Sequence, residues 1–355
     1  MTAAVAGLAL VLAACGSSSS SSTETSAPAS SSAESTTVAV DVGNGTVQLP
    51  KGALKVGIFM NAQSNQWQQA VANNAKKVAE SYGWTATITE YNFDEQKMED
   101  AMRTAITNKT YDAWVVVPID GVASCKLVTE EAPKANILVT VAGTTMCGRD
   151  NKSVPDMWAP GTYSYHALAP SPDYQRKWFA ALAKRYPGPQ KVAYVVGPEA
   201  NGATIVAHTI GDEFSNSQAD FKVVDYINTD YSAPTTFAAV QAYLQAHKDT
   251  TLILSIYSPD VSQGTVQALK SLGLAGKLKM SDMGGAQFTI DQIKAGVIDL
   301  TMPYYPVTQG ENTVKAIKDA QDGVTPKRIY DEIPGGIDNA LIITKDNVDS
   351  FTPQY

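Results

Sequence analysis

Side chains that could do catalytic chemistry are few in this chain. Its only histidines, His166, His208 and His247, stand far apart, and none has the paired spacing of a metal site. The sequence contains neither a GxSxG nucleophile motif nor a GxxxxGK[ST] phosphate-binding loop. The sequence therefore favours binding over catalysis and predicts no metal and no cofactor, with an enzyme on an α/β scaffold as a remote alternative.

The best candidate for binding chemistry is a polar loop at residues 61–66, between a predicted strand and a predicted helix. Residues 56–60 form a near-continuous apolar run of strand length, typical of a strand that is covered on both faces. Beyond the loop, apolar residues recur at helical spacing from Trp67 to Tyr82. This order predicts the first half of a β-α-β unit, whose loop opens at the carboxyl edge of the sheet, where α/β proteins bind ligands.

The same alternation continues along the chain. Further strands are predicted at 85–90, 113–118, 137–141, 191–196, 222–226, 251–256 and 277–281, and helices at 95–108, 122–131, 173–186, 204–216, 235–247, 261–272 and 288–295. Strands that alternate with helices of ten to fifteen residues predict doubly wound, mostly parallel sheets. A length of 355 residues exceeds one ordinary core, so the sequence predicts an α/β protein with two lobes.

Composition narrows the class of partner. The chain is 44% hydrophobic and 17% charged, as in globular proteins. Its formal net charge is -8, and it has no cluster of lysine and arginine. A nucleic-acid partner is therefore not expected, because phosphate binding requires such clusters.

The amino terminus resembles an export signal. Residues 3–14 are an apolar run of signal-peptide length, too short to cross a bilayer. They lead into Leu-Ala-Ala-Cys-Gly at 12–16, which resembles the lipobox of bacterial lipoproteins. The resemblance implies lipidation of Cys15, export, and anchoring to the outer face of the cytoplasmic membrane. The positively charged leader of such signals is missing here, and an ordinary cleaved signal with a chance cysteine is the alternative.

The signal and lipobox occupy 1–15, and a flexible tether is predicted at 16–51. It contains six consecutive serines and little that could be buried. Such a segment cannot offset the entropy cost of ordering. Residues 38–49 could form a short β segment within this tether.

From residue 54 to residue 351 the chain resembles type I periplasmic binding proteins of the ribose/galactose class, the solute receptors of ABC importers. The motifs that carry the resemblance are KVGIFMNAQSNQWQQAV, VVVPIDGVAS, LVTVAG, GTVQALKSLGL, the MSD segment and IKAGVIDLTMPYYPVTQGENTVKAI. The resemblance implies two Rossmann-like lobes joined by a three-segment hinge, with a ligand cleft between them. Lobe one would comprise 52–161 and 307–335, and lobe two 162–306 and 336–355.

The resemblance also implies a set of cleft residues and a class of ligand. The residues expected at the cleft are Asn65, Gln66, Trp67, Asp120, Gly143, His208, Tyr257, Ser258, Asp282 and Tyr304. Asp282 matches the family aspartate that accepts hydrogen bonds from ligand hydroxyls, and Trp67 offers a flat face for a sugar ring. The Asp-Arg pair of sugar binders is replaced by Ala142 and Gly143. A small, neutral, hydroxylated solute such as a sugar or polyol is therefore expected, with an aromatic or other metabolite as the alternative.

Structural alternatives for three of these residues stay open. Trp67 could be a core residue of its helix, Asp282 could cap the helix that follows it, and His208 could be a partly exposed helix residue. Two cysteines, Cys125 and Cys147, fall at the carboxyl edge of the predicted sheet, so in an exported protein they are candidates for a disulfide. Two free thiols are the alternative.

Two functional classes follow. The leading hypothesis is a monomeric, lipid-anchored receptor that delivers a solute to an ABC permease. The alternative is a ligand sensor of the same fold that reports to a membrane kinase or receptor.

Overall fold

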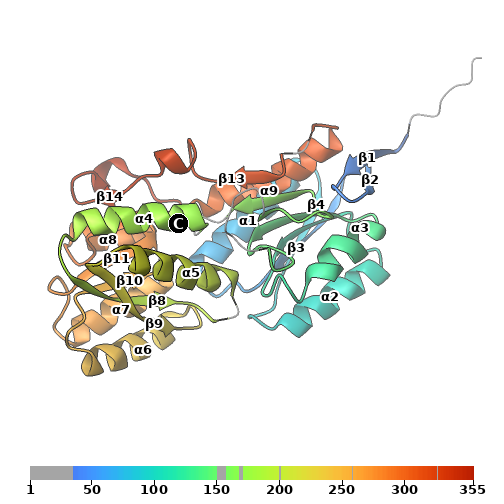
Figure 1. Ribbon diagram of the computed structural model, residues 1–355. Coiled ribbons are helices and arrows are strands. Elements are labelled where there is room, and N and C mark those ends of the chain that lie inside the picture. The colour runs from blue at the N-terminus through green and yellow to red at the C-terminus, as the bar shows by residue number, and fades with distance from the viewer. Residues whose placement is uncertain (1–34, 150–156, 168–170, 200, 258, 326) are drawn as a thin grey trace, which may run out of the picture. The chain divides into compact units, whose positions relative to one another are not determined.

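The computed structural model describes residues 35–149, 157–167, 171–199, 201–257, 259–325 and 327–355, and the predicted cleft residue Ser258 lies outside this part. The signal segment and the serine-rich residues up to 34 also lie outside it. Residues from Thr36 to Tyr355 form one compact unit, which contains two six-stranded sheets with their helices (Figure 1).

The first sheet is parallel throughout and has the order β13-β7-β6-β5-β3-β4. Its strands are β3 (Lys55–Met60), β4 (Thr85–Glu90), β5 (Ala113–Val117), β6 (Leu138–Gly143), β7 (Ser164–Ala167) and β13 (Ile329–Asp331). Its helices are α1 (Gln66–Ser81), α2 (Glu95–Thr107), the π-helical turn η1 (Leu127–Glu131), α3 (Ala132–Lys134) and α9 (Pro306–Gln321). We call this sheet and its helices the first lobe.

The second sheet has the order β14-β12-β11-β10-β8-β9 and is parallel except for β14. Its strands are β8 (Gln190–Val196), β9 (Phe221–Asn228), β10 (Leu252–Ser255), β11 (Lys279–Gly284), β12 (Leu300–Pro303) and β14 (Ile343–Thr344). Its helices are α4 (Pro172–Arg185), α5 (Gly202–Ser217), α6 (Ala233–Ala246), α7 (Asp260–Ser271) and α8 (Gln287–Lys294), followed by the 3₁₀ turns η3 (Ile337–Asn339) and η4 (Val348–Ser350). This is the second lobe.

The strands are apolar because helices cover both faces of each sheet. Along β3, Ile58 and Met60 belong to the cluster that includes residues of α1 and α9, whereas Phe59 belongs to the cluster beneath α2. All five residues of β5 are buried. Such two-sided burial explains why the strands read as continuous apolar runs rather than as alternating patterns.

The chain passes between the two sheets three times. It leaves the first sheet after Ala167, returns between Pro303 and Pro306, and leaves again after Asp331. The predicted first boundary at 161/162 is therefore wrong by several residues. It assigned β7 to the second lobe, but β7 pairs with β6 and β13 of the first sheet. The predicted boundary at 306/307 falls one residue inside α9, and the boundary at 335/336 falls within the third crossing.

The predicted tether is also too long at its carboxyl end. A hairpin of β1 (Thr37–Asp41) and β2 (Thr46–Pro50) belongs to the compact unit. Val47 and Leu49 are completely buried and join the larger core cluster, because alternate residues of the hairpin face the same side. The end of the predicted tether is thus part of the folded body.

The helix predicted at 122–131 is shifted along the chain: residues 121–124 are turns, and the helical residues run from Cys125 through the π-helical turn η1 to the end of α3 at Lys134. Pro133 has no backbone N–H, so the carbonyl of Thr129 loses its normal helical donor. The Asp120 carboxylate accepts hydrogen bonds from the backbone of Val122 and Ala123, at 2.7 and 3.2 Å, and this holds the preceding segment as a turn.

Candidate functional site

Loops from both sheets meet at a small cavity, which we call the inner chamber. It is lined by Asn61, Asn65, Trp67, Gln68, Val117, Gly143, Thr144, Asn201, Ala203, Tyr231 and Tyr257. Asn61, Val117 and Gly143 lie at the carboxyl ends of β3, β5 and β6, and Tyr231 and Tyr257 follow β9 and β10. The chamber thus lies where open α/β sheets bind ligands. Its volume is only about 20 Å³, which is the space of a single water molecule.

Aromatic rings from the two lobes meet at this chamber. The ring of Trp67, at the start of α1, lies edge-on to that of Tyr257, with centroids 6.2 Å apart. Tyr257 makes a second edge contact with Tyr231 at 5.0 Å. Both contacts have the perpendicular geometry that aromatic pairs prefer. Apolar ring faces and edges therefore form a large part of the chamber wall.

The polar groups of the chamber are amides and hydroxyls. Gln68 Nε2 donates to Asn61 Oδ1 at 2.7 Å, and Asn65 caps α1 by accepting from the backbone N–H of Gln68 at 2.9 Å. Gln68 is only 2% exposed, and its Oε1 atom has no hydrogen-bond partner among the described residues. On the second lobe, Tyr231 donates to Asn201 Oδ1 at 2.9 Å. A buried acceptor without a partner is costly, so Gln68 Oε1 is suited to a donor that a ligand supplies.

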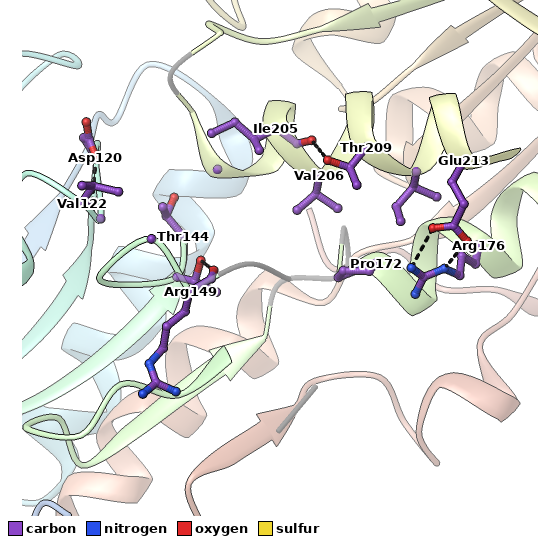
Figure 2. A pocket seen from close by; sticks show the side chains of 15 residues that line it. Asp120, Val122, Thr144, Arg149, Pro172, Arg176, Ile205, Val206, Thr209 and Glu213 are labelled. Carbon is purple, nitrogen blue, oxygen red and sulfur yellow. Dashed lines mark hydrogen bonds and ion pairs between the residues drawn. The ribbon is translucent and has the colours of Figure 1, made fainter. Parts of the chain in front are cut away.

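A second and larger cavity, the outer chamber, is lined by residues of both lobes (Figure 2). Its volume is about 430 Å³, and its lining residues are Asp120, Gly121, Val122, Thr144, Thr145, Gly148, Arg149, Pro172, Arg176, Gly202, Ile205, Val206, Thr209, Ile210 and Glu213. Thr144 lines both chambers. Residues of α4 and α5 form one side, and loops that follow β5 and β6 form the other.

The two lobes approach closely where the chambers adjoin. A Cβ atom placed on Gly202 would lie 2.9 Å from Cγ2 of Thr144, closer than side chains normally pack. Gly202 is the first residue of α5, and Thr144 follows β6. Glycine at 202 therefore permits this contact between the lobes.

Comparison with known proteins identifies the family. Residues 56–325 match the family described as periplasmic binding protein domain. The chain belongs to this family. No curated protein matches the chain.

Solved structures share the fold at low sequence identity. One is an ABC transporter solute-binding protein from Bacillus halodurans with bound myo-inositol, with a TM-score of 0.73 and 15% identity over 86% of this chain and 99% of that one. Another is an ABC transporter solute-binding protein from Mycobacterium smegmatis with bound glycerol, with a TM-score of 0.71 and 19% identity over 86% and 98%. A third is the periplasmic binding protein of the arabinose ABC transporter from Shewanella, bound to L-arabinofuranose, with a TM-score of 0.70 and 17% identity over 83% and 93%. These likenesses show the two-lobed fold of periplasmic binding proteins.

Several residues predicted at the cleft lie at the chambers. Asn65, Trp67, Gly143 and Tyr257 line the inner chamber, and Asp120 lines the outer one. Trp67 is only 4% exposed, so it is both a core residue of the first lobe and a wall of the chamber.

Gln66 contributes through its backbone. Its N–H, in the first turn of α1, donates to the Asp260 carboxylate of the second lobe, and this bond lowers the Asp260 pKa although burial raises it overall. Gln66 lines neither chamber among the described residues. It therefore links the lobes rather than forming a chamber wall.

Asp282 was also predicted at the cleft, and the structure places it in β11 of the second sheet. Asp282 is fully buried in β11, and it lines neither chamber in the part of the chain that the structure describes. Its Oδ2 accepts hydrogen bonds from Ser262 Oγ at 2.7 Å and Thr289 Oγ1 at 2.5 Å. Burial raises the pKa of the Asp282 carboxyl from 3.8 to about 6, although these hydrogen bonds lower it in part. The side chain thus ties α7 and α8 to the sheet.

His208 and Tyr304 also line neither chamber among the described residues. The His208 ring packs on Tyr226 of β9, with centroids 4.0 Å apart, because it projects from α5 toward the sheet. Tyr304 is 1% exposed and donates to the carbonyl of Ile256 at 2.8 Å. The Tyr304 ring also contacts the Tyr257 ring edge-on, with centroids 5.4 Å apart.

Asn61 belongs to the binding loop predicted at 61–66. The chamber residues that were not predicted from the sequence are Gln68, Val117, Thr144, Asn201, Ala203 and Tyr231. Of these, Val117 ends a strand and Thr144 follows one directly, so the strand-end rule applied to every predicted strand could have found these two.

The sulfur atoms of Cys125 and Cys147 lie 2.07 Å apart, and their Cα atoms 4.7 Å apart. The pair joins the turn after β5 to the loop after β6, and Gly148 and Arg149 of that loop line the outer chamber.

No group of histidine, cysteine, aspartate or glutamate in the described ranges could hold a metal ion. Across the same ranges, no helix is long and apolar enough to cross a bilayer.

Proposed function

We propose that the protein is an extracytoplasmic solute-binding receptor of an ABC importer and that its solute is small, neutral and hydroxylated. The observation behind this proposal is the unpartnered, buried Gln68 Oε1 atom in a chamber walled by Trp67 and Tyr257. An amide oxygen accepts a hydrogen bond from a hydroxyl, and an aromatic face or edge packs on the C–H groups of a sugar or polyol. Family membership and the sugar and polyol ligands of the similar structures support the same class of solute.

A neutral solute also agrees with the charges. None of the described residues that line the inner chamber is an aspartate, glutamate, lysine or arginine. A charged solute buried there would have no ionic partner, and burying an unpaired charge is costly. Only one feature of the chamber, its aromatic walls, favours the alternative solute, an aromatic or other small metabolite.

Binding must involve separation of the lobes. The inner chamber, at about 20 Å³, is too small for a sugar, and residues of both lobes form its walls. A solute that enters the separated lobes and then contacts both of them stabilises the closed arrangement by those contacts. Closure is then the signal that a permease can read.

The envelope location is a further part of the proposal. The lipobox-like segment at 12–16 supports lipidation of Cys15, and a lipid anchor would hold a monomeric receptor beside its permease. The geometry of Cys125 and Cys147 supports a disulfide, which suits an exported protein. Cys15→Ala should move the protein from the detergent phase to the aqueous phase in a phase-partition assay, and detergent partitioning of this variant would refute the anchor.

The test of solute binding is a thermal-shift screen with monosaccharides, polyols, nucleosides and aromatic acids. A solute that binds the folded state selectively raises the melting temperature. The binding solute is then titrated into Gln68→Met, which keeps the length of the side chain but removes the unpartnered acceptor. One lost hydrogen bond predicts about tenfold weaker affinity. If no sugar or polyol raises the melting temperature, the proposed class of solute is wrong.

The matched control is Gln69→Met. Gln69 is the next residue of α1, but it is exposed and donates to the carbonyl of Gln63 at 2.9 Å. This variant should bind like the unchanged protein. Equal affinities of the Gln68 and Gln69 variants would show that the inner chamber is not the hydroxyl-reading site.

A further inference from the structure

We infer that the solute has an apolar substituent in addition to its hydroxylated part and that the outer chamber holds this substituent. The inference rests on the proposed function and specifies the class of solute. An alkyl or aryl ether or glycoside has this chemistry, whereas a free monosaccharide does not.

The surface of the outer chamber is largely aliphatic. Val122 of the first lobe is 64% exposed and Ile205 of the second lobe is 52% exposed, and both line the chamber. Only six large hydrophobic side chains of the described residues are exposed, and these are two of them. Pro172 and Val206 extend the same surface (Figure 2), and Ile210 also lines the chamber. Exposed apolar groups that gather in one cavity mark a binding site more often than scattered ones do.

Several polar side chains of this chamber are already engaged within the protein. Asp120 accepts from backbone amides two and three residues further on. Thr209 donates at 2.9 Å to the carbonyl four residues before it, and Thr145 donates at 3.0 Å to the carbonyl of residue 149. Arg176 makes two bonds of 2.9 Å to Glu213. A ligand that offered only hydroxyls would therefore compete with these bonds, whereas an apolar group would not.

The two chambers can serve one solute because they share Thr144. Consecutive residues of the second lobe face alternate chambers: Asn201 and Ala203 line the inner one, and Gly202 lines the outer one. The chambers are therefore separated by about the thickness of one residue. The volume of about 430 Å³ lies in the range of small-molecule pockets, roughly 300–1,000 Å³, whereas the inner chamber can hold little.

The test compares free polyols and monosaccharides with their methyl, butyl and hexyl ethers or glycosides, titrated by calorimetry into the full folded protein. Burial of one methylene strengthens binding about three- to four-fold. The affinity should therefore rise at least about tenfold from the methyl to the butyl form of the polyol or sugar that binds. Ile205→Asn should reduce this ratio of butyl to methyl affinity several-fold.

Val324→Asn is the matched control. Val324 has the same exposed fraction as Ile205, 52%, and lines neither chamber among the described residues. This variant should keep the full ratio. Equal affinities of the methyl and hexyl forms, or the same ratio in both variants, would overturn the inference and leave the proposed function intact. If neither free nor alkylated forms bind, the proposed function fails and the inference fails with it.

Discussion

The buried carboxyl of Asp282 should make the stability of the protein depend on pH in a predictable direction. Its pKa is about 6 in the folded chain, against an ordinary value of 3.8, because burial disfavours the charged form. Its Oδ1 atom has no hydrogen-bond partner in the described part of the chain, so one half of the carboxylate is poorly compensated. Between these two pKa values the folded chain binds a proton more tightly than the unfolded chain does.

The sign follows from this difference in proton binding. The stabilising contribution of protonated Asp282 is fully present below pH 3.8 and is lost as the pH rises through about 6. The difference between these two pKa values corresponds to about 3 kcal/mol of unfolding free energy. About 2 kcal/mol of that loss should fall between pH 4.5 and pH 7.

The measurement is urea unfolding of the unchanged protein and of Asp282→Asn at several pH values between 4.5 and 7.5. Asparagine has nearly the same shape but does not titrate. The unfolding free energy of the variant relative to the unchanged protein should therefore increase by about 2 kcal/mol from pH 4.5 to pH 7. Asp291→Asn, an exposed position on α8, is the control and should show no such trend. Parallel stability curves for the unchanged protein and Asp282→Asn would refute the reasoning.

Three further predictions concern closure, the disulfide and the hairpin. Gly202→Ala should weaken solute affinity in calorimetry without lowering the melting temperature, because the new Cβ meets Thr144; unchanged affinity would contradict the lobe contact. Thiol labelling of the unfolded, unreduced protein should modify neither Cys125 nor Cys147. Reduction should lower the free energy of unfolding by about 3 kcal/mol, because the two cysteines are 22 residues apart in the sequence. Labelling of both cysteines without reductant would exclude the disulfide. Leu49→Ala should lower the free energy of unfolding, measured with urea, by about 2–5 kcal/mol, because Leu49 is completely buried. An unchanged urea midpoint would show that the hairpin does not belong to the core.

The sequence predicted most elements of the fold because their apolar patterns are strong and local. The helix expected after the polar loop begins at Gln66, where Asn65 caps it as short polar residues do. The four-residue strand β12 was not predicted as a separate element, since so short a run resembles a loop. The hairpin was only weakly indicated, because the burial of Val47 and Leu49 depends on a core formed by distant segments.

The binding site was harder to predict, for a physical reason that Asp282 illustrates. A strand buried on both faces has no polar face, so its sequence does not show which residues point toward the ligand edge. The alternation of strands and helices predicted a strand at 277–281, close to the observed β11, but the direction of the Asp282 side chain depends on Ser262 and Thr289, from two different helices. His208 is similar: its contact with Tyr226 joins α5 to β9 and leaves no local signal in the sequence.

The contact between Trp67 and Tyr257 also constrains the solute that the inner chamber can accept. These rings come from different lobes, so separation of the lobes breaks their edge contact, which is worth about 0.5–1.5 kcal/mol. A solute gains affinity only if its own contacts exceed those that it replaces. Hydroxyls alone would satisfy Gln68 Oε1 but would leave the ring surfaces without a partner. A solute with both a hydroxyl donor and an apolar face replaces both kinds of contact. This favours a cyclic polyol or sugar over a short polyol that has no apolar face.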